Sequence, residues 1–416
     1  MKIQELENKT LGDLRKVARE HGVKNYTACR KPELIKKILA AIVEKDGFAT
    51  VEGTLEVMND GTYGVLRTDG VLPSNNDVYI SGSQIKKFGL KTGDFVSGPA
   101  RLPKEKEKYL SLLRVDTVYG KSASACTERP NFSKLTVIFP QDQLKLETTS
   151  NIYSTRMMDL LAPIGLGQRA MIVSPPKTGK TIMIKEIANG ISTNSPKTKL
   201  MVVLVGERPE EVTDMERSVD GDVFASNFDE MPEHNCKVAE MALEKAKRLV
   251  EWGEDVVILM DSITRLARAY NITMPTSGRT LSGGFDPIAL YPPKKFFGAA
   301  RNFEEGGSLT IIATALVDTG SRMDDLVYEE FKGTGNMELH LDRNLAQRRI
   351  YPSIDINKSG TRNEELLLDK DVLNQSWRIR RMLEVLNDNE NPTEVLLDRM
   401  KKTKDNKELL ATLHEA

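Results

Sequence analysis

The chain has 416 residues, and its 59 lysines and arginines nearly balance its 60 aspartates and glutamates, which gives a formal net charge of −1. This balance excludes binding to nucleic acid by bulk positive charge, and a content of 39% hydrophobic and 29% charged residues excludes wholesale disorder. The length predicts two or three domains. No apolar run approaches the roughly 20 residues of a bilayer-spanning helix, and residues 1–10 lack an apolar core, so we expect a cytoplasmic protein with no membrane partner. The three cysteines and four histidines show neither disulfide nor metal-ligand spacing.

Residues 1–46 form a basic segment. Residues 1–45 contain eleven Lys and Arg against six Asp and Glu, a local net charge of +5. Apolar residues recur at helical spacing in 11–18 and again in 34–42, with His21-Gly22 between them. The pattern predicts a small helical module. It is either a helical cap exposed to solvent or a surface that contacts nucleic acid.

Residues 47–118 contain short apolar runs that are bounded by Gly, Asn and Asp. One of these boundaries is an expected turn at 59–61. The runs predict the strands of a small closed or partly closed β-barrel, and they lie at 49–57, 63–67, 78–80, 94–100 and 109–115. The aromatic and charged residues gathered here are Tyr63, Tyr79, Tyr109, Arg67, Asp77, Glu107 and Lys108. Bases stack on aromatic rings, basic side chains hold phosphates, and a carboxylate accepts from a base amino group. The barrel is therefore a candidate site for single-stranded RNA, although tyrosines also occur in strands for packing alone.

Residues 119–150 are polar and irregular, which is typical of a linker between domains.

Residues 151–416 show a different pattern of apolar and polar residues. Strand-like apolar runs alternate with helical patterns; the runs lie at 170–173, 200–205, 255–261 and 308–317, and the helical patterns at 182–191, 238–250 and 263–270. This alternation predicts a parallel sheet flanked by helices.

The most specific motif follows the run at 170–173. It reads Ser174-Pro175-Pro176-Lys177-Thr178-Gly179-Lys180-Thr181. Strand, loop and helix in that order are the context of a phosphate-binding P-loop, in which backbone N–H groups cradle phosphates at a helix N-terminus. Lys180 would reach the β and γ phosphates of ATP, and the Thr181 hydroxyl would hold Mg²⁺. Ser174 replaces the usual first glycine of the motif, and we expect the Pro-Pro pair to stiffen the loop in its place.

Two carboxylates end apolar strands of the same region. Asp261 ends the run that begins at residue 255, as the Mg²⁺-binding aspartate of a Walker B strand does. Glu207 follows the run at 200–205. Because ligands bind beyond the carboxyl ends of strands in open α/β sheets, Glu207 is a candidate to polarise the attacking water. A surface acid at a strand end would give the same pattern.

Two loops rich in glycine and hydroxyl groups, at 276–284 and 319–324, each carry one arginine. Such loops can grip a phosphate backbone without reading bases, and they can equally be ordinary surface loops. Arg362 follows a glycine far from the P-loop in sequence. It is a candidate arginine finger that acts on a neighbouring subunit.

Together, these motifs resemble the bacterial transcription termination factor Rho family. The resemblance is carried by residues 175–181, 207–213, 261–271, 296–302 and 328–336, and it weakens at 119–150 and after about residue 368. It implies an α/β fold with a RecA-like P-loop ATPase core at 151–416, an N-terminal helical module and an OB-like, cold-shock-type β-barrel. It also implies a homohexameric ring that uses ATP and Mg²⁺, translocates on nascent RNA and dismantles RNA polymerase elongation complexes together with elongation factors.

The resemblance further implies roles for individual residues. It gives catalytic roles to Lys180, Glu207, Arg362 and Arg349, and metal roles to Thr181 and Asp261. It implies nucleotide contacts for Gly165, Leu166, Gly167, Gln168, Arg169, Ala170, Lys177, Thr178, Gly179, Lys180, Thr181, Ile182, Arg208 and Tyr351. It places a primary RNA site at Tyr63, Gly64, Val65, Leu66, Arg67, Asp77, Val78, Tyr79, Glu107, Lys108 and Tyr109, where Val65 replaces a customary aromatic residue. It places a secondary RNA site in a central channel at Arg279, Thr280, Leu281, Ser282, Gly283, Gly284 and Arg322.

Two other classes of protein share parts of this pattern. Rotary ATPase subunits also join an N-terminal β-barrel to a RecA-like core, and they would hydrolyse ATP without nucleic acid. A passive RNA-binding protein with a regulatory nucleotide site is the third possibility. The dependence of ATP hydrolysis on cytidine-rich RNA separates the first two classes, and displacement of an RNA–DNA duplex identifies the third.

Overall fold

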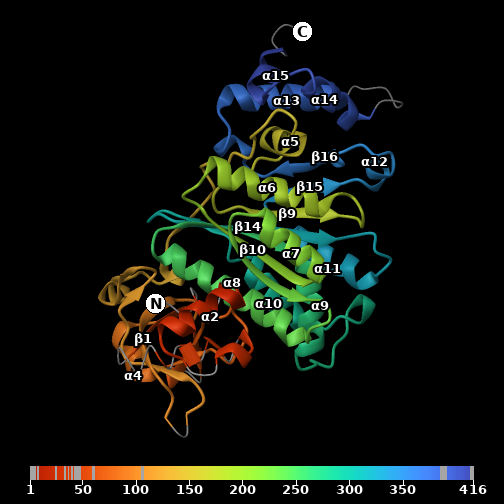
Figure 1. Cartoon of the computed structure of the whole chain (residues 1–416). Helices are drawn as coiled ribbons and strands as arrows, with labels where there is room; N and C mark the ends of the chain where they lie inside the picture. The colour runs from red at the N-terminus through yellow and green to blue at the C-terminus, as the bar shows by residue number, and fades with distance from the viewer. Residues whose placement is uncertain are drawn as a thin grey trace. The chain divides into compact units, whose positions relative to one another are not determined.

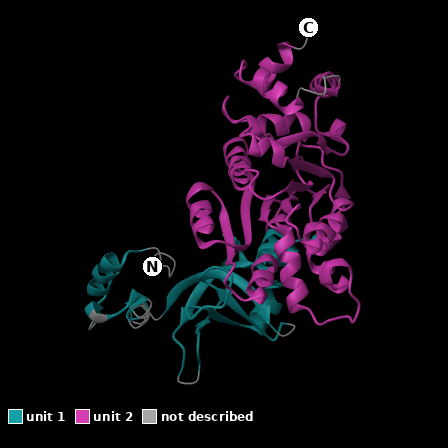
Figure 2. Cartoon of the chain, turned by 90° about the vertical axis from the view of Figure 1, so that its right-hand side faces the viewer, with its two compact units in different colours: residues 1–132, 241–248 teal, residues 133–240, 249–416 magenta. Residues whose placement is uncertain are grey.

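The computed structural model describes residues 6, 9–23, 26–31, 34, 35, 37, 38, 41, 48–58, 61–104, 107–384 and 391–412. The chain forms two compact units, coloured separately in Figure 2. Unit 1 is Met1–Phe132 with Met241–Arg248, and unit 2 is Ser133–Glu240 with Leu249–Ala416. The expected helical positions Leu39 and Ile42 and the turn residues 59 and 60 lie outside the described residues. Within the described ranges, no helix is both long enough and apolar enough to span a membrane.

The helical pattern at 11–18 is confirmed by helix α2 (Leu11–Glu20). The helix begins where the Thr10 hydroxyl accepts a hydrogen bond from the Asp13 backbone N–H at 3.3 Å, which satisfies an otherwise unpaired donor of the first turn. Its apolar face buries Leu14 and Val17. A single 3₁₀ turn, η1 (Tyr26–Ala28), follows.

The predicted barrel is confirmed in unit 1. Its strands are β1 (Ala49–Met58), β2 (Tyr63–Arg67), β3 (Val78–Ser81), β4 (Phe95–Arg101), β5 (Leu110–Leu112), β6 (Thr117–Val118) and β7 (Lys121–Ser122), with helix α4 (Gly82–Phe88) after β3. The strand order is β1-β2-β3-β5-β4, and β4 also pairs with β1, so these five strands close on themselves. Closure leaves no open edge among the five strands, which is how a small barrel avoids pairing with other chains.

Unit 2 contains the predicted parallel sheet (Figure 1). Its strands are β8 (Val137–Ile138), β9 (Arg169–Ser174), β10 (Lys199–Glu207), β11 (Asp222–Asn227), β12 (Asp255–Asp261), β13 (Arg301–Phe303), β14 (Ser308–Leu316), β15 (Met337–Leu341) and β16 (Ile354–Thr361). The order is β11-β10-β12-β14-β9-β15-β16, in which only β16 is antiparallel to its neighbour, and β13 pairs with β14 and β8. The central strands are buried along nearly their whole length, as the continuous apolar runs of the sequence require.

Helices cover both faces of this sheet. The other helices that the structure describes are α5 (Tyr153–Leu161), α6 (Lys180–Asn194), α7 (Pro209–Ser218), α8 (Pro232–Glu251), α9 (Ile263–Thr273), α10 (Tyr291–Phe297), α11 (Arg322–Lys332), α12 (Arg343–Gln347), α13 (Lys370–Glu384), α14 (Pro392–Met400) and α15 (Asn406–Thr412). Short 3₁₀ turns are η3 (Ala123–Glu128), η4 (Phe132–Lys134), η5 (Ser282–Gly284), η6 (Pro287–Leu290) and η7 (Glu364–Leu366). The main core joins α5, α6, α7 and α13–α15 to alternate residues of the strands, such as Ala170 and Ile172 of β9.

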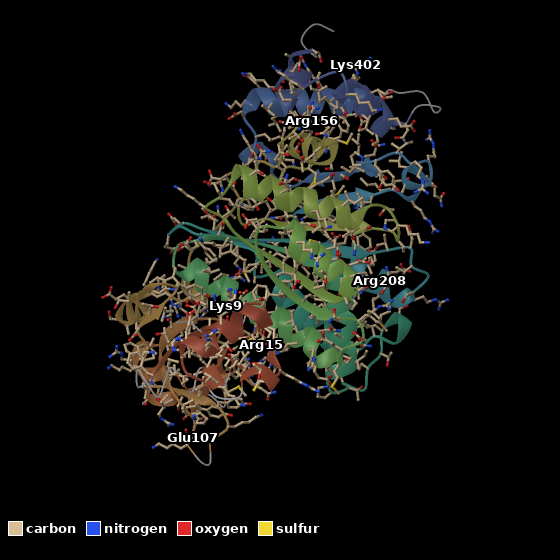
Figure 3. The ribbon with its side chains drawn as sticks, viewed as in Figure 1. Lys9, Arg15, Glu107, Arg156, Arg208 and Lys402 are labelled. Carbon is tan, nitrogen blue, oxygen red and sulfur yellow. The ribbon has the colours of Figure 1, made fainter. Side chains whose placement is uncertain are left out.

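The segment 119–150, expected as a linker, contains β7, η3, η4 and β8 and ends packed against α5. Leu144 and Leu146 are buried in the core of unit 2, and the Asp159 carboxylate accepts the Leu146 backbone N–H at 3.0 Å. On the same helix, the fully buried Arg156 donates to the carbonyl oxygens of Met400 and Thr403, both at 3.1 Å (Figure 3). These contacts fix the C-terminal helices to α5.

Candidate functional site

The P-loop is built from β9, a tight loop and helix α6, which begins at Lys180. Gly179 precedes the helix with φ of 90°, a left-handed conformation that glycine adopts without strain. Ser174, the departure from the motif, is buried, and its hydroxyl lies 2.8 Å from that of Thr178. Thr178 in turn donates to the Pro175 carbonyl at 2.8 Å. Two side-chain hydroxyls thus hold the loop closed, in addition to any stiffness from the prolines.

Three strand ends bring the predicted catalytic groups together. Lys180 forms an ion pair with Asp261 at the end of β12, and its Nζ lies 3.8 Å from Oε1 of Glu207 at the end of β10. The Thr314 hydroxyl of β14 donates to Asp261 Oδ1 at 2.8 Å. Arg265 of α9 places Nη2 3.3 Å from Glu207 Oε1. The site therefore holds two cations against two carboxylates.

The Glu207 carboxyl is the least satisfied group of this cluster. It is 3% exposed, and its Oε1 atom accepts no hydrogen bond from the described residues. Burial, and after it the negative charge of Asp261, raise the pKa of Glu207 to about 7 against the lowering effect of Lys180 and Arg265. A carboxyl with a pKa near neutrality, next to a P-loop, has the properties needed to orient and deprotonate water.

Other predicted nucleotide contacts surround the P-loop. The Tyr351 ring is half-exposed and lies against the loop, because a β-carbon built on Gly179 would be 3.4 Å from its Cε1 atom. Arg349 is exposed two residues earlier on the same segment. Arg208, at the start of α7, is exposed and forms an ion pair with Glu211 at 3.1 Å. Thr181 and Ile182 lie in the first turn of α6, with Ile182 61% exposed.

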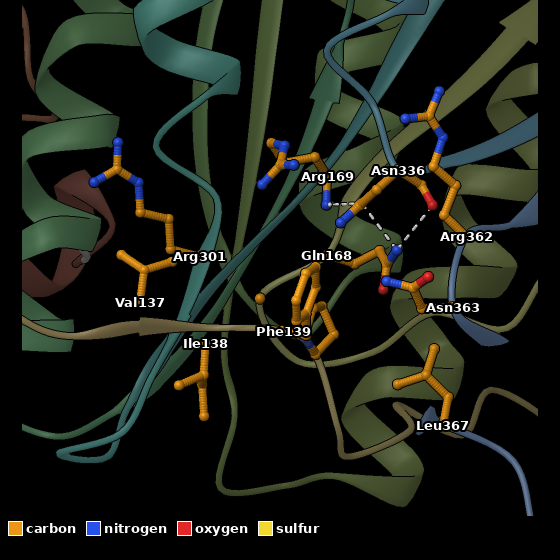
Figure 4. A pocket seen from close by; sticks show the side chains of 12 residues that line it. Val137, Ile138, Phe139, Gln168, Arg169, Arg301, Asn336, Arg362, Asn363 and Leu367 are labelled. Atoms are coloured by element: carbon orange, nitrogen blue, oxygen red, sulfur yellow. Dashed lines mark hydrogen bonds between the residues drawn. The ribbon is translucent and has the colours of Figure 1, made fainter. Parts of the chain in front are cut away.

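The remaining predicted nucleotide residues lie elsewhere. Gly165 to Gln168 precede β9, and Arg169 and Ala170 are its first two residues, whereas the P-loop follows the strand. Since β9 has six residues and a strand rises about 3.3 Å per residue, the two places are separated by about 20 Å along the strand. The resemblance gives this segment as a further nucleotide contact, and within one chain it lies at the other end of β9 from the P-loop. Arg362, which follows β16, lies with Gln168 and Arg169 in a cavity of about 520 Å³ (Figure 4).

The barrel displays part of the predicted primary RNA site on its surface. The Tyr63 and Tyr79 rings stack with centroids 5.9 Å apart and an interplanar angle of 21°. They are diagonal neighbours, because Val65 pairs with Tyr79 across β2 and β3. The Lys108 ammonium lies 4.9 Å from the centre of the half-exposed Tyr109 ring. Glu107 is exposed and receives a two-point hydrogen bond from Arg101, which lowers the pKa of Glu107 to about 2.

The other residues of the predicted primary site are buried. Gly64, Val65, Leu66 and Val78 belong to the barrel interior or its backbone. Arg67 is 7% exposed; its guanidinium pairs with Asp77 and donates to Glu56 Oε2 at 2.9 and 2.6 Å. Two carboxylates of the barrel thus engage the Arg67 guanidinium, and the contact of Arg67 with RNA stays a prediction.

The predicted secondary RNA loops lie side by side. Residues 279–284 and Arg322 are all exposed, and a β-carbon on Gly283 would lie 2.7 Å from the Met323 backbone nitrogen. The second loop is anchored by Asp324, which is 1% exposed and accepts from Arg268 Nε at 2.7 Å. Arg268 and Arg265 belong to the same helix, α9, so one helix contacts both Glu207 and Asp324 at the base of the predicted RNA loops.

Sequence reasoning assigned no role to several residues of these sites. Arg265 stands inside a motif that carries the family resemblance, so it left a signal. Thr314 is one of three buried hydroxyl residues of β14, with Ser308 and Thr310, and the sequence does not single it out. Arg301 and Asn336, which line the cavity beside Arg362, left none beyond lying within motifs of the resemblance. Their positions depend on strands far apart in the chain.

Comparison with family models places three domains on the chain. The model of the Rho termination factor N-terminal domain matches residues 5–47, and that of the Rho termination factor RNA-binding domain matches residues 51–124. The model of the nucleotide-binding domain of the ATP synthase alpha/beta family matches residues 154–361.

Full-length relatives are similar over nearly the whole chain. The chain is 56% identical to the transcription termination factor Rho of Bacillus subtilis over 413 residues, which is 99% of this chain and 96% of the relative. It is 53% identical to the Thermotoga maritima protein of the same name, over 98% of this chain and 96% of the relative. Among solved structures, an ATPase from the type III secretion system of pathogenic bacteria matches 68% of this chain and 86% of its own, with 21% identity and a TM-score of 0.57. That last likeness concerns the fold alone.

Proposed function

The chain belongs to the transcription termination factor Rho family, and we propose that it terminates transcription as an ATP-driven RNA translocase in a homohexameric ring. It is an RNA-dependent ATPase of the helicase type. The observation that carries the proposal is the convergence of Lys180, Asp261 and Glu207 at one end of a parallel sheet, in a chain that also carries an RNA-binding barrel. The proposed domains are 1–46, 47–118, a connecting segment at 119–150, and 151–416.

ATP binds at the P-loop in this proposal. The backbone N–H groups of residues 177–181 face the phosphates at the N-terminus of α6, where the helix dipole favours negative charge. Lys180 moves from Asp261 to the β and γ phosphates, which exchanges one charged partner for another. The exposed ring of Tyr351 offers a flat face for the adenine next to the loop.

The residues present fit Mg²⁺ bound together with the nucleotide. Mg²⁺ is usually held by one or two carboxylates plus substrate phosphates and water, and Asp261 and Thr181 provide a carboxylate and a hydroxyl at this point. The described part of the chain gathers no group of three acidic, histidine or cysteine ligands. Magnesium would therefore enter with ATP, where it neutralises charge on the phosphates.

Hydrolysis requires a water and a cation at the γ phosphate. Glu207 orients and deprotonates the water, because its buried Oε1 atom is free of hydrogen bonds from the described residues and faces the Lys180 side. Arg362 lies beyond the opposite end of β9 from the P-loop of its own chain, so in this proposal it reaches the nucleotide of a neighbouring copy. This geometry supports a ring in which each nucleotide lies between two copies.

Helix α9 supplies a physical route from ATP to RNA. Arg265 contacts Glu207 and the Gly206 carbonyl, and Arg268, nearly one turn later, holds Asp324 at the start of α11. A small displacement of α9 on hydrolysis would therefore move Arg322 and residues 279–284 together. We propose that these loops grip the RNA backbone in the channel.

The barrel captures the RNA before it enters the channel. The Tyr63 and Tyr79 rings offer a stacking surface for bases, and Lys108 offers a cation for phosphate. Nascent RNA brings the ring to the RNA polymerase elongation complex and its elongation factors, which are the remaining proposed partners. Bacterial transcription takes place in the cytoplasm, and we place the protein there.

The direct test is the rate of ATP hydrolysis with and without cytidine-rich single-stranded RNA. We expect strong stimulation by RNA, and a loss of about 10²- to 10⁴-fold in the Glu207→Gln variant, because a general base is removed. Glu216→Gln, an exposed acid on α7, is the matched control and should keep the parent rate.

Equal rates with and without RNA would contradict the proposal and favour a subunit of the rotary ATPase class. Displacement of an RNA–DNA duplex is the second readout. RNA-stimulated hydrolysis without displacement would reduce the protein to an RNA-binding ATPase that does not translocate.

A further inference from the structure

The carboxylate of Asp261 is held by a hydroxyl that the proposed function does not use. Thr314 of β14 is 1% exposed, and its hydroxyl donates to Asp261 Oδ1 at 2.8 Å. In the sheet, β14 lies between β12, which Asp261 ends, and β9, which leads into the P-loop (Figure 1). Met260 of β12 pairs with Ala313 of β14, and Asp261 and Thr314 come next on the two strands. The hydroxyl therefore reaches the carboxylate from the neighbouring strand, at the edge of the sheet where the P-loop begins.

The direction of this hydrogen bond is fixed by the chemistry of its partners. An ionised carboxylate only accepts hydrogen bonds, so the hydrogen atom comes from Thr314. In the part of the chain that the structure describes, the Thr314 hydroxyl makes no other hydrogen bond. Asp261 is 2% exposed, and a buried carboxylate that loses a donor has little water to replace it. The bond thus satisfies Asp261 and restricts the orientation of its carboxylate.

The two oxygen atoms of Asp261 have different surroundings. Lys180 and Thr314 both donate to Oδ1, and among the described residues no group donates to Oδ2. In the proposed function, Lys180 leaves Asp261 for the phosphates of ATP. Thr314 belongs to a buried strand and keeps its place, so Oδ1 remains engaged after Lys180 has moved. Oδ2 is then the oxygen that is left for Mg²⁺ and its water.

A second bond of the same kind joins β12 and β14 at their other ends. The fully buried Ser308 donates its hydroxyl to Asp255 Oδ1 at 2.7 Å. Asp255 and Ser308 are the first residues of the two strands and pair with each other. Because β12 has seven residues and a strand rises about 3.3 Å per residue, this bond lies about 20 Å from Asp261. The pair of strands therefore contains a hydroxyl–carboxylate bond far from the P-loop and another one beside it.

We propose that Thr314 is a positioning residue, which orients the Asp261 carboxylate for the Mg²⁺ ion that binds together with the nucleotide. The identity of the ligand rests on the proposed function, whereas the hydrogen bond does not. Groups that hydrogen-bond a metal-binding carboxylate fix its orientation, and changing them typically lowers metal affinity or activity about 10- to 100-fold. Ser308, in contrast, only fastens the two strands to each other.

The test measures metal binding directly, with the full chain and ADP. Mn²⁺, a paramagnetic substitute for Mg²⁺, is titrated and its free concentration is read by electron paramagnetic resonance. Thr314→Val keeps the branched shape without the hydroxyl, and the Kd for Mn²⁺ in the ADP complex should rise about 10- to 100-fold. Thr314→Ser keeps the hydroxyl and should retain most of the parent affinity. The affinity for ADP without metal, measured by calorimetry, should be the same in all three chains.

Ser308→Ala is the matched control, because it removes the equivalent bond at the far end of the same two strands. It should lower the temperature of thermal unfolding, as the loss of a buried hydrogen bond does, and leave the Kd for Mn²⁺ unchanged. Metal binding therefore separates a positioning role from a contribution to stability alone. The Mg²⁺ concentration that gives half-maximal ATP hydrolysis should rise in the Thr314→Val chain and stay at the parent value in the Ser308→Ala chain.

Three results overturn the proposal. The first is equal Mn²⁺ affinity in the parent and Thr314→Val chains. The second is a loss in Thr314→Ser as large as that in Thr314→Val, which would assign the effect to packing of the methyl group. The third is an equal loss in Ser308→Ala, which would assign it to the joining of the strands. Hydrolysis that ignores RNA in the parent chain would instead defeat the proposed translocase and leave the comparison of Mn²⁺ affinities readable.

Discussion

The barrel and the cavity at the start of β9 contain arginines in opposite electrostatic situations. In unit 1, Arg67 is buried and meets two carboxylates, those of Glu56 and Asp77. In unit 2, Arg169 and Arg362 share a cavity with a third arginine and, within the described ranges, with no paired carboxylate. The barrel neutralises its buried charge internally, whereas the cavity leaves its charge for something outside the chain.

The P-loop is intermediate between these two cases. Lys180 and Arg265 face Glu207 and Asp261, so the charges balance, but Glu207 retains an oxygen without a hydrogen bond from the described residues. Charge alone therefore does not identify a ligand site. A cation whose partners belong to the chain stabilises the fold, and a cation without such partners lowers stability and remains available to bind.

The largest effect should come from removing the barrel arginine. Arg67→Met leaves two buried carboxylates unpaired, which costs about 3 to 5 kcal/mol of local stability. Amide hydrogen exchange in β1 and β2 should show this loss. Arg301→Met is the matched comparison, and it should leave exchange in β13 and β14 unchanged or slower, because it relieves repulsion. Equal destabilisation by both variants would contradict the distinction between the two regions.

The surface of the barrel should affect RNA rather than stability. Tyr79→Ala removes one face of the ring stack, and a base stacked on an aromatic side chain contributes about 1 to 3 kcal/mol. The Kd for cytidine-rich RNA should therefore rise about 5- to 150-fold, as measured by fluorescence anisotropy. Tyr291→Ala, which removes a 74% exposed ring from unit 2, is the control. Equal affinities for the parent and Tyr79→Ala chains would remove Tyr79 from the RNA site.

The smallest effect concerns pH. Burial and the neighbouring Asp261 raise the pKa of Glu207 to about 7, and only the ionised carboxylate can accept a proton from water. The kcat/KM for ATP should therefore increase as pH rises through 7, by about tenfold between pH 6 and pH 8, and then level off. A profile that is flat over this range, measured at saturating RNA, would show that Glu207 does not titrate in the rate-determining step.

The sequence predicted the strands and motifs whose patterns are strong over a few residues. The apolar runs that became β9, β10, β12 and β14 were recognised because central parallel strands are buried on both faces. The strands β11, β15 and β16 were not predicted. β15, for example, alternates buried and half-buried residues over only five positions, which is too short to distinguish from a loop.

The roles of individual residues were harder to predict, because they depend on contacts between residues that lie on different strands. Arg67 and Asp77 were read as charged groups for RNA, because nothing in the local pattern reveals that Glu56, on the neighbouring strand, completes a buried ion-pair network. The segment 165–170 was predicted as a further nucleotide contact, and the sequence does not show that this segment and the P-loop lie at opposite ends of β9.

Local sequence patterns were enough to predict where phosphate chemistry would be found and which fold would carry it. Lys180 and Thr181 at a strand–loop–helix junction, and the carboxylates that end two apolar strands, follow from local spacing and from the constant geometry of parallel strands. The tertiary structure decided which charges are already satisfied and which are left to bind. That decision depends on pairs such as Arg67 with Glu56, and on groups such as Arg169, Arg301 and Arg362, whose members are brought together only when distant strands pack.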